Sequence, residues 1–181
     1  MPPKQKYTSE FIIEQATEII ASGEELTARA LADKIGSSTQ PIFSQFSDME
    51  KLKAAVYENA GKIYEKYVYE VTRDMPKYKS TGYGYVQFAR EKTNLFKLLF
   101  MGKMREENES DKEKIIDIVA SATSYPRFVA EKFHVMQWIF VHGIATMIAT
   151  GYLKWDEKTV SEMISEEYFS LKEKFDKEYK K

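Results

Sequence analysis

The sequence contains no cysteine among its 181 residues and only two histidines. The absence of cysteine excludes a disulfide framework, thiol catalysis and thiolate metal ligands. His134 and His142 are eight residues apart, and no carboxylate lies between them at a spacing typical of metal sites. A zinc site is therefore not expected. We predict that the protein holds neither a metal nor a cofactor.

Glycine and proline are also scarce, at eight and five residues. This leaves little room for a long flexible linker, and no low-complexity tract or repeat of 20 to 50 residues is visible. Hydrophobic residues make up 43% of the chain, which is enough to bury a sizeable core. We predict a compact all-α protein of about nine helices.

Signals for enzymatic chemistry are missing as well. The sequence has no Gly-rich phosphate loop and no acid/base pair at catalytic spacing, so a small helical enzyme lacks support. The charged run at residues 105–114 indicates a solvated loop that leads into a helix at about residues 111–122. The first ten residues contain no apolar segment of the kind found in signal peptides, so a cytoplasmic protein is expected.

The most hydrophobic stretch is residues 133–153, which contain no Lys, Arg, Asp or Glu. Its 21 residues would be long enough to span a bilayer, but polar residues inside it and the lack of flanking basic clusters argue against a membrane protein. A helix that is apolar on most faces is instead buried on its own domain and against a partner chain. With the amphipathic helix expected at residues 159–178, it can form a four-helix dimer interface. The interface residues that we predict are Ile139, Val160, Ile164, Tyr168, Leu171 and Phe175.

Residues 26–46 have the pattern of two short helices joined by a sharp turn. Thr27 can cap the first helix, and Gly36 follows its last apolar residue, where the chain needs a positive φ. Ser38 can cap the second helix, and Pro41 falls in its first turn, where a missing N–H is tolerated. An amphipathic helix at residues 8–22 can close a three-helix core around them. The pattern therefore predicts a helix-turn-helix.

The residues after this motif strengthen the prediction. Ser47 and Glu50 have the spacing of a capping box, which predicts the start of a long helix. With Phe43, Phe46 and Leu52, this part of the chain resembles the tetracycline-repressor (TetR) family of bacterial transcription regulators over about residues 8–57. Phe43, Gln45 and Met49 depart from the Tyr, His and Lys that are common in the family. These departures indicate that some DNA-backbone contacts are lost or moved.

The resemblance implies a homodimeric regulator, with a helix-turn-helix DNA-binding domain at residues 1–48 and an effector-binding and dimerisation domain at residues 49–181. A small-molecule effector would release the repressor from a palindromic operator in double-stranded DNA. The Trp138-x-x-x-His142-Gly143 string also resembles a C-terminal subtype named after its Trp, His and Gly. The DNA-binding residues that we predict are Thr27, Arg29, Ser38, Thr39, Gln40, Phe43, Ser44 and Lys51. The predicted effector pocket comprises Tyr64, Tyr85, Phe88, Phe96, Phe100, Met101, Trp138 and His142, although an aromatic stripe of this kind can also be core.

Net charge does not favour DNA binding at first sight. Residues 1–60 carry six Lys or Arg against nine Asp or Glu, a net charge of −3. Residues 26–55 alone carry four basic residues against three acidic ones, a net charge of +1. We therefore expect a weak nonspecific electrostatic contribution and binding that depends on dimerisation and a few base contacts. The alternative is a helical interaction or ligand-binding module that has lost specific DNA binding.

Overall fold

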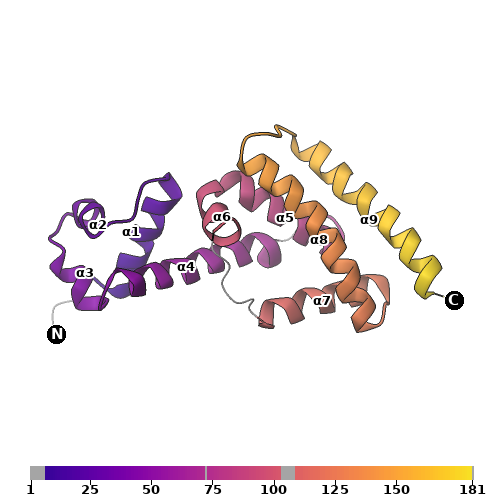
Figure 1. Ribbon diagram of the computed structural model, residues 1–181, viewed down its shortest axis with the longest axis horizontal. Coiled ribbons are helices and arrows are strands. Elements are labelled where there is room, and N and C mark those ends of the chain that lie inside the picture. Colours follow the sequence, from indigo (N-terminus) through magenta and orange to yellow (C-terminus); the bar gives the residue numbers. More distant parts are fainter. Residues whose placement is uncertain (1–6, 72, 103–108, 181) are drawn as a thin grey trace. The chain divides into compact units, whose positions relative to one another are not determined.

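The computed structural model describes residues 7–71, 73–102 and 109–180. Within these ranges the chain forms nine α-helices and one π-helical turn and contains no strand (Figure 1). The all-α prediction is confirmed. The first six residues and positions 105–108 of the charged run lie outside the described residues.

The chain divides into two compact units, the first of which comprises residues 1–64 and 92–102. Its fully buried side chains include Ile12, Leu31, Ile42 and Leu52, one from each of its first four helices. The last helix packs on the first, and the Asn94 side chain donates a hydrogen bond to the carbonyl of Ala21 at 3.0 Å. The helices of this unit are α1 (Ser9–Ser22), α2 (Ala28–Ile35), α3 (Gln40–Gln45), α4 (Met49–Glu65) and α6 (Thr93–Phe100).

The start of α4 differs from the predicted capping box. Asp48 caps the helix, because its Oδ1 accepts a hydrogen bond from the Lys51 backbone N–H at 2.8 Å. The Ser47 hydroxyl donates to the other carboxylate oxygen of Asp48 at 2.9 Å. The prediction of Ser47 as the cap was wrong, because Asp48 directly precedes the first helical residue, Met49, and its carboxylate reaches the third. The hydrogen bond from the Lys51 N–H has the largest effect in lowering the pKa of the Asp48 carboxyl, and the one from Ser47 lowers it further.

We predict that Asp48→Ala lowers the melting temperature, whereas Ser47→Ala has a smaller effect. Because the folded-state pKa of Asp48 is depressed, its stabilisation is present above its unfolded-state pKa of about 4 and is lost as the pH falls through the folded-state value. The difference in melting temperature between wild type and Asp48→Ala should therefore shrink below about pH 4. Thermal unfolding followed by circular dichroism at pH 7 and pH 3 measures it. A larger effect of Ser47→Ala would show that the serine is the true cap.

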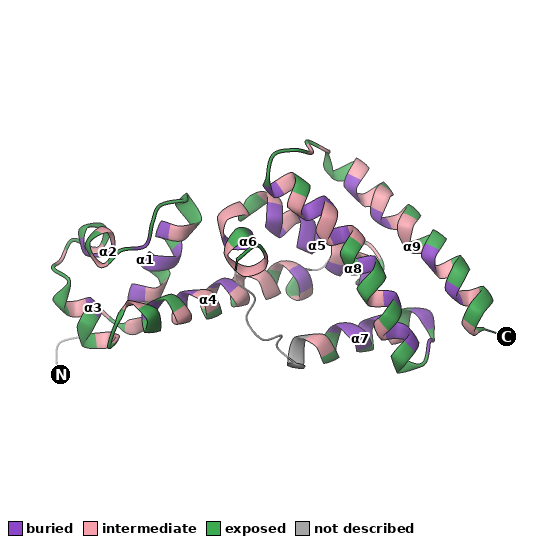
Figure 2. Cartoon of the chain, in the orientation of Figure 1, coloured by how far each residue is buried: buried purple, intermediate pink, exposed green. Residues whose placement is uncertain are grey.

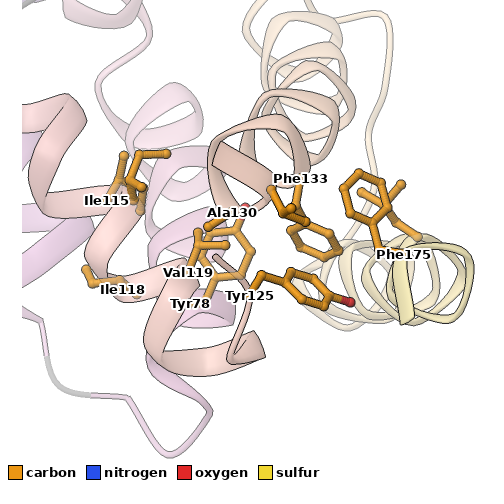
Figure 3. Packing of buried hydrophobic residues seen from close by; sticks show 11 residues of the cluster. Tyr78, Ile115, Ile118, Val119, Tyr125, Ala130, Phe133 and Phe175 are labelled. Carbon is orange, nitrogen blue, oxygen red and sulfur yellow. The ribbon is translucent and has the colours of Figure 1, made fainter. Parts of the chain in front are cut away.

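The second unit comprises residues 65–91 and 103–181. Phe133, on helix α8 (Arg127–Ala149), lies in one of its buried clusters, with the Phe175 ring perpendicular to it at 5.2 Å and the Tyr125 ring at 5.8 Å (Figure 3). None of the described helices is both long and apolar enough to cross a membrane. The elements of this unit are η1 (Lys66–Glu70), α5 (Lys77–Glu91), α7 (Glu109–Thr123), α8 (Arg127–Ala149) and α9 (Glu157–Tyr179).

The backbone of the π-helical turn η1 lies close to the backbone of helix α5. A Cβ atom at Gly84 of α5 would lie only 2.2 Å from the carbonyl oxygen of Tyr67 in η1. The Arg73 guanidinium donates to the same carbonyl oxygen at 3.0 Å and to Gln87 Oε1 at 3.0 Å. Another guanidinium nitrogen donates to the Ser80 hydroxyl at 3.1 Å. Arg73 and Gly84 together hold η1 against α5 at Tyr67.

Candidate nucleic-acid interface

The turn between α2 and α3 has the local structure that the sequence predicts. The Thr27 hydroxyl oxygen accepts a hydrogen bond from the Ala30 N–H at 3.1 Å and caps α2. Gly36 has a φ of 63°, in the left-handed region, and ends α2. The Ser37 N–H then donates to the carbonyl of Ala32 at 3.0 Å, which completes a glycine-based helix terminus. The predicted cap and turn are both confirmed.

Helix α3 buries one of its side chains in the core of the first unit. Ile42 is fully buried in the same cluster as Leu31 of α2, and it is the buried residue of α3. Thr39 precedes α3 in the cap position, but its side chain makes no capping hydrogen bond. Ser38 accepts only a long hydrogen bond, 3.4 Å, from the Gln40 N–H. The prediction that Ser38 occupies the cap position was therefore wrong by one residue.

The remaining face of α3 is open to solvent. Gln40, Phe43 and Ser44 are exposed, and so are Ser38 and Thr39 before the helix. Phe43 keeps 46% of its surface exposed, which is unusual for a large aromatic side chain. The Ser44 hydroxyl donates to the Gln40 carbonyl at 2.8 Å, so in this conformation it has only acceptor capacity left for a ligand. Five of the eight predicted DNA-binding residues thus lie together on one exposed surface.

The basic residues near this surface fall into two groups. Lys34 forms a salt bridge with Glu18 at 2.9 Å, and Lys53 forms one with Glu50 at 2.9 Å. Arg29 of α2 and Lys51 of α4 are exposed, and neither side chain forms a salt bridge with a described residue. These two side chains are the cations of residues 26–55 that remain available to phosphates.

Four of the predicted effector-pocket residues belong to the first unit. Phe96 is fully buried, and its ring lies 5.2 Å from that of Phe100. The Phe100 ring also contacts that of Tyr64 edge-on at 5.1 Å. Met101, by contrast, is exposed. Phe96, Phe100 and Tyr64 form an aromatic cluster within the unit, and their contact with an effector stays a prediction.

The other four lie in the second unit. The Tyr85 hydroxyl and His142 Nδ1 are hydrogen-bonded at 2.8 Å, and the Trp138 ring stacks on that of His142 at 5.0 Å. Burial lowers the pKa of His142 and raises that of Tyr85, so both groups are neutral near pH 7. Phe88 is fully buried. A shallow surface depression, too open to enclose a ligand, is lined by other residues: Tyr83, Val86, Gln87, Arg90, Glu157 and Val160.

The residues predicted for the dimer interface divide by exposure. Ile139 of α8 is 60% exposed, and Tyr168 of α9 is half-buried. The others are buried within a single chain: Val160, Ile164, Leu171 and Phe175. The apolar stripe of α9 is therefore explained by packing against the other helices of its own unit. A partner chain is not needed to cover it. These four side chains stabilise the fold of one chain.

A different apolar surface remains exposed on α8 and α9, and of the predicted interface residues it contains only Ile139. Buried and exposed residues both occur along the whole of α8 (Figure 2). Phe128, Val135 and Ile139 follow one another at intervals of seven and four residues, which places them on one helix face. We call the following residues the α8–α9 apolar surface: Phe128, Val135, Met136, Trp138, Ile139, Met147 and Phe169. The lack of charged residues at positions 133–153 indicates such an exposed apolar face. A helix with only one buried side would carry charged residues on its other side.

Comparisons with known proteins agree with this architecture. Residues 79–167 match the family model of the tetracyclin repressor-like C-terminal domain. The fold is similar to a solved structure described as a TetR family transcriptional regulator from Vibrio parahaemolyticus, with a TM-score of 0.61 and 17% sequence identity. That match covers 92% of this chain and 98% of the other. Among curated proteins, none matches the chain.

Proposed function

We propose that this chain, a member of the TetR family by its C-terminal domain and its fold, is a homodimeric repressor that binds a palindromic operator. The observation that carries the proposal is the exposed face of α3, which follows a capped helix and a glycine turn and is anchored by Ile42. In a helix-turn-helix, the second helix lies in the major groove and its exposed side chains contact base edges. Gln40 and Phe43 are the candidates for those contacts.

The surrounding residues can bind the DNA backbone. The Thr27 hydroxyl accepts the capping hydrogen bond from Ala30, so its own hydrogen remains available for a phosphate oxygen. Arg29 and Lys51 supply the available positive charges, and Thr39 supplies a further exposed hydroxyl. Phosphate contacts of this kind set the register of the protein on DNA, while the base contacts give specificity.

The proposed dimer forms through the α8–α9 apolar surface. A two-fold interface lets each subunit present one α3 to successive half-sites of a palindrome. Large apolar side chains that stay exposed in a single chain, such as Phe128 at 70% and Ile139 at 60%, are covered in this proposal by the partner subunit. A stable interface of about 2,000 Å² in total is expected if this surface packs against its symmetry mate.

A small molecule bound in the C-terminal domain would shift the dimer to a conformation in which the two reading helices have the wrong separation for the operator. The side chains of Tyr85, His142 and the stacked Trp138 are all neutral and aromatic, which favours an uncharged effector. The loss of specific DNA binding is the alternative, because Phe43, Gln45 and Met49 replace residues common in the family.

A selection experiment decides between an operator-binding repressor and a protein that has lost specific DNA binding. The full-length protein is incubated with random double-stranded DNA, bound sequences are enriched, and a mobility shift measures their affinity beside DNA from upstream of the protein's own gene. We expect a palindrome with half-sites separated by about one helical turn or a multiple of it. If no sequence is enriched over the starting pool, the protein is an interaction module rather than an operator-binding repressor.

We predict that Lys51→Ala weakens binding to all DNA sequences by a similar factor. Binding weakens as salt rises, so the slope of log K against log salt is negative. Loss of one phosphate contact in each subunit should make this slope less steep by about 0.9 per subunit. Lys53→Ala is the matched control, because Lys53 is two residues away on α4 but is paired with Glu50. Titrations between 50 and 200 mM salt, on the order of the range in which phosphate contacts show clearly, measure both slopes. Equal slopes for wild type and Lys51→Ala would remove Lys51 from the phosphate contacts.

A further inference from the structure

The reading surface of α3 contains no positive charge. Residues 35–50, which include α3 and both of its flanks, have no Lys and no Arg. The exposed side chains of α3 are the amide of Gln40, the ring of Phe43 and the hydroxyl of Ser44. Arg and Lys are the side chains that most often recognise guanine, through its O6 and N7 acceptors. This surface lacks the groups that bind guanine best.

Gln40 has the groups that recognise adenine rather than guanine. Its side-chain amide makes no hydrogen bond with any described residue and is exposed at the start of α3. A glutamine amide has one acceptor and two donor hydrogens, which match the N6 amino group and N7 of adenine together. Ser44 adds a second acceptor, because its hydrogen is already donated to the Gln40 carbonyl. Two acceptors favour a base that presents an amino group in the major groove.

Phe43 supplies an apolar contact beside Gln40. Residues three positions apart on a helix are neighbours, with Cβ atoms about 5–6 Å apart, so the two side chains can reach adjacent base pairs. The Phe43 ring has no hydroxyl that would engage a phosphate, and the C5-methyl of thymine is the apolar group that bases present in the major groove. Binding of the methyl group would remove both apolar surfaces from water.

We propose that each α3 recognises two adjacent A·T base pairs, with Gln40 on the adenine of one pair and Phe43 on the thymine methyl of the next. This assignment rests on the proposed function and adds to it the class of base pairs that the operator contains. It also implies that specificity comes from uncharged groups, so base discrimination changes little with salt while overall affinity changes with the Arg29 and Lys51 contacts.

Base analogues test the proposal on an operator found by selection. Replacing the adenine assigned to Gln40 by 7-deazaadenine removes its N7 acceptor. Replacing the thymine assigned to Phe43 by uracil removes only the methyl group. We expect the first change to weaken wild-type binding about five- to tenfold, as for a lost neutral hydrogen bond. The second should weaken it about fourfold, as for the loss of one buried apolar carbon. Binding is measured by mobility shift with the full-length dimer.

Three variants separate the two contacts. Gln40→Ala should bind 7-deazaadenine and adenine operators equally but still distinguish uracil from thymine, and Phe43→Ala should show the reverse. Gln45→Ala, at the partly buried end of α3, is the control and should distinguish both pairs as the wild type does. An operator with G·C pairs at the α3 positions, or equal analogue effects in wild type and variants, would overturn the assignment while leaving operator binding intact. Failure to enrich any sequence would instead contradict the proposed function.

Discussion

Ile139→Asp is expected to give folded monomers that no longer bind the operator. Ile139 is 60% exposed in the single chain and lies in the α8–α9 apolar surface, so the substitution leaves the core of the subunit unchanged. In the proposed dimer, the aspartate would be buried against the apolar surface of the partner subunit. Burial of an unpaired charge costs several kcal/mol per ion, and the two-fold symmetry places this cost on both subunits. Sedimentation and thermal unfolding together separate loss of the dimer from loss of the fold.

Ile164→Asp is the matched comparison, and it should behave differently. Ile164 is only 3% exposed and packs inside its own chain, where its side chain lies near Gly82 of α5. A charge at this position would be buried without a partner in the monomer itself, so we expect the second unit to unfold. If Ile139→Asp remains a dimer at micromolar concentration, the α8–α9 apolar surface is not the interface, and the paired half-site mechanism fails with it.

Gly84→Ala is expected to destabilise the second unit by about 1–3 kcal/mol, or more if the backbone cannot adjust. The added methyl group would lie 2.2 Å from the Tyr67 carbonyl oxygen, which is backbone and is also bound by the Arg73 guanidinium. Relief of this overlap requires η1 and α5 to separate. The Arg73 guanidinium could then no longer hold both of its hydrogen bonds, to Tyr67 of η1 and to the Ser80 hydroxyl of α5.

Gly82→Ala provides the control on the same helix. A Cβ at Gly82 would make ordinary van der Waals contact with Val141 at 3.6 Å. A glycine in a helix interior costs about 0.5–1 kcal/mol relative to alanine, so Gly82→Ala should be neutral or stabilising. Both tryptophans, Trp138 and Trp155, belong to the second unit, so urea unfolding followed by tryptophan fluorescence reports on it directly. Equal midpoints for the two variants would show that η1 and α5 can separate at little cost.

The sequence by itself determined the features that depend on residues close together along the chain. The Thr27 cap, the Gly36 turn and the placement of Pro41 in the first turn of α3 each involve groups within four residues of one another. Hydrogen bonds and φ preferences on this scale are properties of the local sequence. For the same reason the helix-turn-helix could be predicted, together with its resemblance to the TetR family and the all-α fold.

Where two residues could serve the same local role, the geometry decided between them. Ser47 and Asp48 are both good helix caps, and so are Ser38 and Thr39. The structure places Asp48 and Thr39 directly before the first helical residue of α4 and α3. A shift of one residue changes which side chain reaches the free N–H groups, and the sequence pattern does not resolve a shift of that size.

Only the tertiary structure decided which apolar faces are covered within one chain. The stripe of Val160, Ile164, Leu171 and Phe175 predicts a buried face, but burial against α8 and burial against a partner select the same residue types. The packing of the second unit assigns these residues to its own core and leaves Ile139 and Phe128 exposed. The close approach of Gly84 to Tyr67 is likewise tertiary. The two residues are 17 positions apart, and nothing in the local sequence brings those two backbones together.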